Sequence, residues 1–237
     1  MDTNATDIPY HIQSLLPQES IRHFAKMLAR YELYKKVIDL PGDIVEAGVF
    51  HGEGLICWAQ LAQIFNPLSR RRVVGFDTFQ GFPATTRSEH DRNAGQQANE
   101  CNRPETILSS EDLQARVSAL GLDHRIELVP GDARLLIGEY RRRNPGFRVA
   151  LLYLDFDTYD PTLAALQELY PLLVPGGVVV FDEYAVRGWG ETDAVDEYFE
   201  GRDVTFQTLP WTGSPKAYLV KSPGSTPLVV LRRSECA

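Results

Sequence analysis

Short apolar segments alternate with helical segments along the chain, and this alternation constrains the possible folds more than any other feature. Five segments have the composition of strands: DIVEAG, RVVGFD, RIELVP, VALLYLD and VVVFDEY. Each is separated from the next by residues whose apolar positions recur at helical spacing, as between Glu53 and Phe65. Strands that are apolar throughout and alternate with helices form parallel sheets covered on both faces. We therefore expect an α/β fold with a doubly wound, mostly parallel sheet.

The two ends of the chain extend this pattern. Residues 18–40 carry apolar positions at helical spacing and predict N-terminal helices before the first strand. Near the other end, VTFQTLP and KAYLVK predict a hairpin-like pair that adds an antiparallel strand and brings the sheet to seven strands. We expect one domain over residues 1–237, in which residues 1–40 form a helical extension.

One connection is unusual. Residues 78–104 are polar and rich in Gly, Asn, Gln and Arg, and they are too numerous for an ordinary loop in a compact domain. We expect a lid or a substrate loop here. The alternative is a disordered insertion without a role.

Charge and composition exclude several classes of partner. A net charge of -8 argues against nucleic acid or an anionic membrane bound through a basic surface. The two RRR runs, at 70–72 and 141–143, are expected to be solvated. The chain has no apolar run of about 18 residues, no signal-like start and no CxxC pair, so we expect a cytoplasmic protein with reduced thiols.

Carboxylates follow the expected strands with a regularity that random loops would not produce. The five strand ends read VEAGVFHGEG, GFDTFQGFP, PGDA, LDFD and FDEY, and each contains at least one acid. In open α/β sheets, ligands bind at the carboxyl ends of the strands. We therefore place the functional site at this edge of the sheet.

The first two strand ends favour a nucleoside ligand with a positive centre. Gly48, Gly52 and Gly54 permit close approach of the backbone, and an acid at the end of the second strand, Asp77, suits a ribose diol. The glycines do not form GxGxxG, and Glu46 lies beside them. A pyrophosphate is poorly matched to such acids, whereas a sulfonium is well matched. The pattern favours S-adenosylmethionine over NAD.

The fourth and fifth strand ends predict a metal site. Asp155 on one strand, with Asp182 and Glu183 on its neighbour, would place three oxygen ligands roughly 5 Å apart. Ligation by oxygen alone favours Mg²⁺, Mn²⁺ or Ca²⁺ over zinc, and we expect Mg²⁺. The alternative is structural: Asp155 caps the next helix and Asp182 pairs with an arginine.

The segments VEAGVFHGEGL, GFDTFQGFP, LDFDTYDPT and FDEY, in this order and spacing, resemble the macrocin O-methyltransferase family over residues 43–221. The resemblance implies a Rossmann-like class I methyltransferase fold and methylation of a sugar hydroxyl in natural-product or surface-glycan biosynthesis. WGETDAV resembles the branch of deoxyhexose O-methyltransferases that act on nucleotide-linked sugars. The expected acceptor is therefore a nucleotide-linked or glycoside deoxysugar.

Residue by residue, the resemblance implies that residues 46–52 wrap the methionine and sulfonium part of the cofactor and that Asp77 binds the ribose hydroxyls. The implied cofactor set is Glu46, Ala47, Gly48, Phe50, Gly52, Asp77, Thr78, Phe79, Gly131, Asp132 and Ala133. The implied metal ligands are Asp155, Asp182 and Glu183. Glu183 stands where the family often has Asp, and Phe156 stands where it often has Gly.

Asp157 matches the general base of the family, and His51 is a rival base. Asp160, just before Pro161, is expected to cap the following helix. Five aromatic residues could line a sugar pocket or belong to the core: Tyr153, Tyr159, Tyr184, Trp189 and Trp211. Four arginines are candidates for binding a diphosphate: Arg87, Arg92, Arg103 and Arg187.

Alternatives of other classes stay open at this point. They are a methyltransferase with a non-sugar acceptor, an oxidoreductase or hydrolase that uses the same sheet and metal, and a non-catalytic cofactor-binding protein. We also expect a homo-oligomer, in which the N-terminal helices and the loop 78–104 contact another subunit or close over the acceptor.

Overall fold

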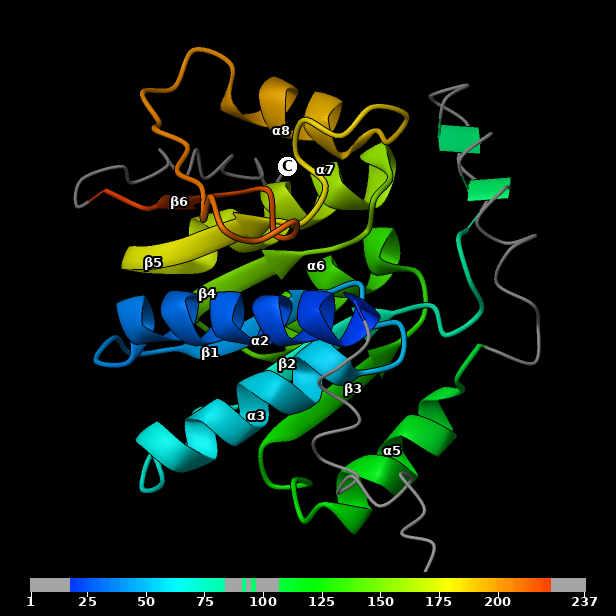
Figure 1. Ribbon diagram of the computed structural model, residues 1–237, viewed down its shortest axis with the longest axis vertical. Coiled ribbons are helices and arrows are strands. Elements are labelled where there is room, and N and C mark those ends of the chain that lie inside the picture. The colour runs from blue at the N-terminus through cyan, green and yellow to red at the C-terminus, as the bar shows by residue number, and fades with distance from the viewer. Residues whose placement is uncertain (1–17, 84–90, 93–94, 97–106, 223–237) are drawn as a thin grey trace, which may run out of the picture.

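A computed structural model describes residues 18–83, 91–92, 95–96 and 107–222. Its centre is a sheet of six strands in the order β3-β2-β1-β4-β5-β6 (Figure 1). The strands are β1 (Asp43–Ala47), β2 (Val73–Asp77), β3 (Ile126–Pro130), β4 (Val149–Leu154), β5 (Leu173–Phe181) and β6 (Ala217–Val220). The first five are parallel, and β6 runs antiparallel to β5. The α/β, mostly parallel fold is confirmed.

The predicted seventh strand is not formed in the described part of the chain. The segment VTFQTLP pairs with β6 only through an isolated bridge between Gln207 and Tyr218. A single bridge does not continue into a ladder, so the sheet has six strands there instead of seven. Only KAYLVK supplies the expected antiparallel strand.

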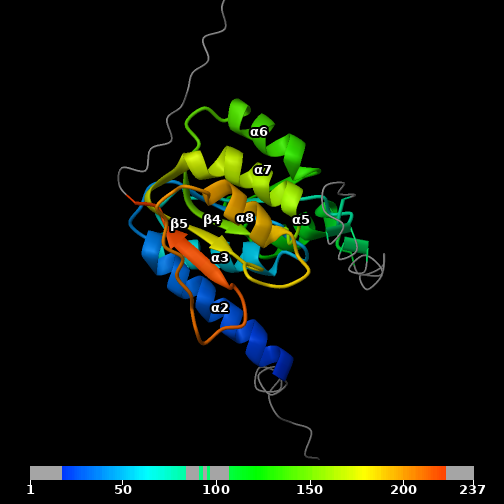
Figure 2. The ribbon, with the colours of Figure 1, turned by 90° about the horizontal axis from the view of Figure 1, so that it is seen from above.

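Helices cover both faces of the sheet. On one face lie α2 (Gln18–Val37), α3 (Glu53–Phe65) and α5 (Ser110–Ala119); on the other lie α6 (Ala133–Arg143), α7 (Tyr159–Leu169) and α8 (Glu191–Phe199). Figures 1 and 2 show the sheet between these two groups. A short 3-10 helix, Tyr170–Leu172, leads into β5. Of the one or two helices expected within residues 18–40, the structure forms one, α2, and Figure 1 shows that it runs antiparallel to β1.

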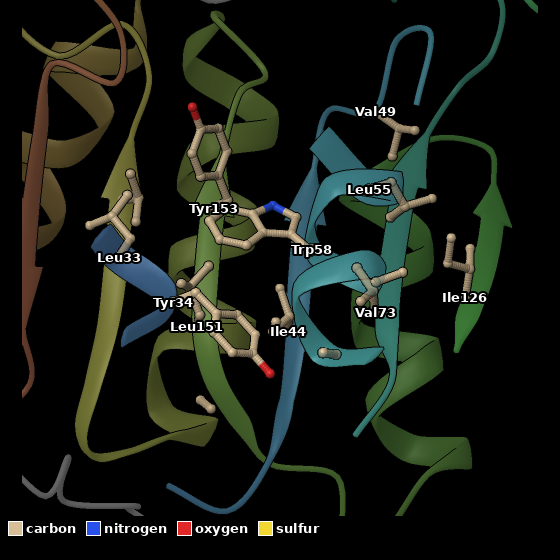
Figure 3. Packing of buried hydrophobic residues seen from close by; sticks show 14 of the residues in the cluster. Leu33, Tyr34, Ile44, Val49, Leu55, Trp58, Val73, Ile126, Leu151 and Tyr153 are labelled. Carbon is tan, nitrogen blue, oxygen red and sulfur yellow. The ribbon is translucent and has the colours of Figure 1, made fainter. Parts of the chain in front are cut away.

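Two apolar clusters hold the layers together. Leu33 and Tyr34 of α2 pack with Trp58 of α3 against one face of the sheet, where Ile44 and Leu151 are fully buried. Figure 3 shows this cluster and shows that the Tyr153 hydroxyl points out of it, toward the carboxyl ends of the parallel strands. The second cluster fills the opposite face, between the sheet and α6, α7 and α8. Burial on both faces explains why the central strands are apolar throughout.

One of the arginine runs departs from expectation. Arg71 is buried, and its guanidinium donates to the main-chain oxygens of Val37, Leu40 and Gly42, just after α2 ends. A cation beside the last carbonyl groups of a helix satisfies acceptors that have no partner within the helix. The prediction of a solvated run was therefore wrong for Arg71.

Within the described ranges, no helix is long and apolar enough to cross a membrane.

Candidate active site

The carboxyl ends of the parallel strands border a cavity of about 360 Å³. This volume lies within the range of ligand pockets, about 300–1,000 Å³. Eight of the eleven predicted cofactor residues line the cavity: Gly48, Phe50, Asp77, Thr78, Phe79, Gly131, Asp132 and Ala133. The structure therefore brings together residues from the ends of β1, β2 and β3, as the sequence predicted.

Asp77 organises the cofactor end of the cavity. Its Oδ2 atom accepts hydrogen bonds from the main-chain N–H groups of Val49 (2.7 Å) and Phe50 (2.9 Å), and Oδ1 accepts from Phe79 (2.8 Å). An ionised carboxylate has about four acceptor positions. The side chain can therefore hold the loop after β1 and the turn after β2 and still accept one bond from a ligand hydroxyl.

The end of β3 closes the same side of the cavity. Gly131 has φ +135°, and its N–H donates to the main-chain oxygen of Asp77 (2.8 Å). Asp132 caps α6: its carboxylate accepts from the main-chain N–H of Arg134 and forms an ion pair with the Arg134 guanidinium. These bonds to Arg134 hold the pKa of Asp132 below its usual value.

Three predicted cofactor residues do not line the cavity. Glu46 is 2% exposed, and its Oε1 atom lies 3.8 Å from the Arg30 guanidinium, on the side of the sheet that α2 covers. Ala47 is in the core, where its main-chain oxygen accepts from the N–H of Asp155. Gly52, at φ +79°, precedes α3 and has no room for a Cβ atom because Leu113 packs against it.

The predicted acids at the ends of β4 and β5 meet around one cation, which is the ammonium group of Lys26. Lys26 Nζ lies 3.4 Å from Asp155 Oδ2 and 3.1 Å from Asp182 Oδ2. The other oxygen of Asp182 accepts from the hydroxyl groups of Tyr153 and Ser214. Asp182 therefore has a fixed orientation, with Oδ2 aimed at the cation.

The two carboxyl groups that share Lys26 titrate differently. Burial opposes ionisation of Asp182, but Lys26 and the hydrogen bonds from Ser214 and Tyr153 outweigh it and lower its pKa. Burial, and then the charge of Asp182, raise the pKa of Asp155 well above its usual value. The single positive charge of Lys26 is therefore not enough to keep both carboxyl groups ionised.

Three more acids surround this pair. Asp157 lines the cavity, and burial together with the charge of Glu183 raises its pKa to about 8. Glu183 is half-buried, and its main-chain N–H donates to Oε1 of Glu191 (2.9 Å). Glu191 is fully buried, which raises its pKa well above the usual value. Neither Asp182 nor Glu183 lines the cavity, whereas Asp155 and Asp157 do.

Backbone strain gathers at the same edge of the sheet. The non-glycine residues with positive φ in the described ranges are Phe50 (+50°), Phe79 (+54°), Asp157 (+61°) and Ala185 (+63°). Each follows the end of a different parallel strand, and the first three line the cavity. Such conformations cost about 1–3 kcal/mol each and cluster at functional sites.

Trp189 and Phe82 form an apolar wall of the cavity, and Asp91 fixes the backbone next to this wall. The rings of Trp189 and Phe82 are stacked at 5.6 Å. Asp91 is fully buried and accepts from the main-chain N–H groups of Tyr159 and Gly190, each at 2.7 Å. Asp91 therefore links residues 91–92 to the starts of α7 and α8.

Asp160 was wrongly predicted to cap α7. The helix begins at Tyr159, so Asp160 lies inside the first turn, and Thr158 in the cap position makes no side-chain cap bond. Asp91, distant in sequence, accepts from the first helical N–H instead.

The rival base His51 is exposed, stacks on Phe50 and does not line the cavity.

The comparison with known proteins fits this geometry. The family model for "Macrocin-O-methyltransferase (TylF)" matches residues 2–211. The chain belongs to the macrocin O-methyltransferase family. Mycinamicin III 3''-O-methyltransferase from Micromonospora griseorubida is 31% identical over 161 residues, 67% of this chain and 61% of that protein. The 8-demethyl-8-(2,3-dimethoxy-alpha-L-rhamnosyl)-tetracenomycin-C 4'-O-methyltransferase from Streptomyces olivaceus is 32% identical over 162 residues, 67% of this chain and 58% of that protein.

The matched region thus spans about three fifths of the length of each of these two relatives. Among solved structures of similar proteins, CalS11, a calicheamicin methyltransferase, superposes with a TM-score of 0.69 at 30% identity, over 91% of this chain and 87% of that one. Its apo structure describes it as a TDP-rhamnose 3'-O-methyltransferase.

The donor set of this macrocin O-methyltransferase family member suits a divalent cation in chemistry and, in part, in geometry. Two carboxylate oxygens converge on one positive charge, and hard oxygen donors are what Mg²⁺ prefers. The predicted three-ligand cluster is not assembled: within the described residues, no group of three or more His, Cys, Asp or Glu side chains is arranged to hold a metal. Lys26 lies between two of the acids, and Glu183 is held through its main chain by Glu191.

The structure shows which of the remaining aromatic and arginine candidates line the cavity. Of the five aromatic residues, Trp189 lines the cavity, whereas Tyr153 is fully buried in the core. Of the four arginines, Arg92 and Arg187 are exposed and do not line the cavity. Arg87 and Arg103 lie outside the described residues, as does most of the predicted lid.

Two residues of the site were not found from the sequence. Lys26 reaches acids that follow it by 129 and 156 positions, so no local spacing marks it. Asp91 is one polar residue within a long polar segment, and its partners lie 68 and 99 positions away. The only available signal was the excess of carboxylates at the strand ends, which requires a positive partner from elsewhere.

Proposed function

We propose that this chain transfers a methyl group from S-adenosylmethionine to a hydroxyl group of a sugar, with help from a divalent cation. The observation that carries the proposal is one cavity in which eight predicted cofactor residues and the acids Asp155 and Asp157 face the same space. Membership of the macrocin O-methyltransferase family supports it. The tetracenomycin relative is named for a rhamnosyl-bearing compound, and CalS11 is described as a TDP-rhamnose 3'-O-methyltransferase of calicheamicin biosynthesis. We extend a role of this kind to the present chain.

The charge of the cavity suits a cationic cofactor. Asp77, Asp132, Asp155 and Asp157 line it, together with the single ammonium of Lys26. A sulfonium cation gains from nearby carboxylates, whereas an anionic cofactor would be repelled by them. Asp77 is the proposed acceptor for the ribose hydroxyls, because three of its acceptor positions are used and one is left.

Asp157 is the proposed general base. It lines the cavity beside Asp155, and its pKa of about 8 lies close to the usual working range of an enzyme. A base is most effective when its pKa is near the operating pH. Asp157 would accept the proton of the sugar hydroxyl as the oxygen forms its bond to the methyl carbon and the bond from that carbon to sulfur breaks.

Positioning supplies the other part of catalysis. Methyl transfer requires the hydroxyl oxygen, the methyl carbon and the sulfur to lie in a line, and held geometry can supply several kcal/mol. The turn that carries Asp157 is strained, at φ +61°, and its main-chain oxygen accepts from the N–H of Glu191 (3.0 Å). The base is thus fixed by the backbone as well as by burial.

Asp155 and Asp182 would hold the divalent cation, and Glu183 is the proposed third ligand. When bound, the cation would stabilise the alkoxide that develops on the acceptor: one unit charge at 4 Å is worth about 4 kcal/mol at an effective dielectric of 20. Tyr153 and Ser214 would keep Asp182 oriented for this role through their bonds to Oδ1.

The acceptor is proposed to be a deoxysugar, either nucleotide-linked or attached to a natural product. The stacked pair of Trp189 and Phe82 offers an apolar wall for a sugar ring. Of the candidate arginines that the structure describes, Arg92 and Arg187 do not line the cavity, so neither distinguishes a nucleotide-linked acceptor from a glycoside. Both kinds of acceptor therefore belong in the test.

The first experiment is a calorimetric titration of the full chain with S-adenosylhomocysteine, with and without Mg²⁺. We expect binding in both conditions and weaker binding by Asp77→Asn, with the exposed Asp203→Asn as a matched control. Methyl transfer is then assayed with TDP-rhamnose and with a rhamnosyl natural product. Absence of any binding of S-adenosylhomocysteine would refute the methyltransferase proposal.

A further inference from the structure

Lys26 reaches the acid cluster from the N-terminal half of α2. Its side chain is 26% exposed and lines the cavity, and its ammonium lies between the Oδ2 atoms of Asp155 and Asp182. A lysine side chain carries a positive charge at neutral pH, and the carboxyl groups of Asp155 and Asp182 beside it favour the charged form.

The position of the ammonium is determined by its partners. Tyr153 and Ser214 occupy Oδ1 of Asp182, which leaves Oδ2 for a cation. The ring of Tyr153 lies beneath, with its centroid 6.0 Å from Lys26 Nζ. A second cation cannot use the same two oxygens at the same time, since two positive charges a few ångströms apart repel each other strongly.

Within the described residues, polar contacts hold the segment that carries Lys26 more than apolar packing does: besides Lys26 itself, His23 bonds to Glu53 of α3 (3.0 Å). The C-terminal half of α2 is anchored by Ala29, Leu33, Tyr34 and Val37, which are fully buried. In the N-terminal half, Ile21, Phe24, Met27 and Leu28 are 41–58% exposed. Figure 2 shows this half of α2 extending beyond the sheet. Segments with few buried apolar contacts open at low free-energy cost.

We infer that the ammonium of Lys26 and a divalent cation compete for one position between Asp155 and Asp182. Entry of the ion would displace Lys26 and loosen the N-terminal half of α2. Departure of the ion would return Lys26 to the two acids. Because Lys26 also lines the cavity next to Asp155, its displacement would enlarge the space beside Asp157. The inference rests on the proposed function only for the assignment of these acids as a metal site.

The test compares Mn²⁺ binding to the full chain and to Lys26→Met, by calorimetry and by electron paramagnetic resonance of the ion. We expect Lys26→Met to bind Mn²⁺ at least about tenfold more tightly, a typical coupling between competing ligands. Lys36→Met, an exposed lysine on the same helix, should bind like the unmodified chain. Lys26→Met combined with Asp182→Asn should lose the gain.

Two further measurements keep the test decisive if Lys26→Met folds poorly. Lys26→Gln is neutral and of similar length, and it should also bind Mn²⁺ more tightly, whereas Lys26→Arg should not. In the unmodified chain, saturating Mn²⁺ should speed amide hydrogen exchange within residues 21–28. Equal Mn²⁺ affinity in the unmodified chain and both neutral variants, or no binding to any of them, would overturn the inference. The arm of the S-adenosylhomocysteine titration without Mg²⁺ involves no metal, so it tests the methyltransferase proposal separately.

Discussion

The main-chain oxygen of Asp155 lies only 2.0 Å from the position that a Cβ atom on Gly48 would occupy. Gly48 follows β1, and Asp155 follows the neighbouring strand β4, so the two turns meet without space for a side chain. Gly48 also has φ +97°, which L side chains rarely adopt. The glycine is therefore required by the backbone of the acid cluster as well as by any ligand above it.

Gly48→Ala should distort both turns. The methyl group would meet backbone atoms, which cannot rotate away, and φ would be strained as well, so we expect the free energy of unfolding to fall by about 3 kcal/mol or more. Gly121→Ala is the matched control, because Gly121 has φ +67° and nothing within 4 Å of its Cβ position. Gly121→Ala should cost about 1 kcal/mol. Denaturant unfolding measures both, and equal losses would contradict the steric argument.

Asp157→Asn should remove the base without disturbing its turn. Asn tolerates the left-handed conformation that Asp157 adopts, at φ +61°. We expect turnover to fall by about 10²–10⁴-fold, while the affinity for S-adenosylhomocysteine stays unchanged. His51→Gln should keep most of the activity, because His51 does not line the cavity. The reverse order of the two variants in a methyl-transfer assay would assign the base to His51.

The sequence predicts the fold well because the relevant signals are local. Apolar strands, helical spacing and the residues at strand ends all act over a few positions, and β1 to β5 appear where those signals lie. The prediction fails where contacts between segments far apart in the sequence determine the structure. VTFQTLP has the composition of a strand, yet it forms one bridge to Tyr218, because pairing depends on the neighbour as well as on composition.

The site shows the same division. Residues from the ends of β1, β2, β3 and β4 meet in the cavity because parallel strands end at one edge of the sheet. The partners of the acids were not predictable, since Lys26 and Asp91 reach them from far away in the chain. The family resemblance implies that Glu46 contacts the cofactor, but side chains alternate along a strand, and the Glu46 side chain faces Arg30.

Asp91→Ala should loosen the apolar side of the cavity. It would leave the main-chain N–H groups of Tyr159 and Gly190 without their acceptor, which costs about 1–3 kcal/mol for buried groups. We expect lower stability and a higher KM for the sugar acceptor, with unchanged affinity for S-adenosylhomocysteine. The exposed Asp193→Ala is the control. A loss of cofactor affinity equal to the loss of acceptor affinity would show that Asp91 supports the whole cavity instead.

Glu46 and Arg30 form a buried pair behind the cavity. Their side chains are 2% and 4% exposed, and within the described part of the chain Glu46 Oε2 and two guanidinium nitrogens of Arg30 have no hydrogen-bond partner. Burial raises the pKa of Glu46 to about 7; the charges of Arg30 and Lys26 oppose the rise, and those of Asp182 and Asp77 add to it. Burial of the charged form is thus only partly compensated.

The raised pKa of Glu46 makes stability depend on pH. Between the unfolded value of 4.5 and the folded value of about 7, the folded chain binds more protons than the unfolded chain. The contribution of Glu46 to stability is therefore complete below pH 4.5 and is lost as pH rises through 7. Glu46→Gln has no proton to lose, so its free energy of unfolding relative to the unmodified chain should rise by roughly 2–4 kcal/mol from pH 4.5 to 7.5. In Glu46→Gln, Arg30 loses its carboxylate partner. Because Arg30 stays charged at every pH tested, this loss changes the free energy of unfolding by the same amount at each pH. Urea unfolding at several pH values measures the difference. Glu200→Gln, at an exposed position, should give a curve parallel to that of the unmodified chain. A parallel curve for Glu46→Gln would show that Glu46 titrates alike in both states.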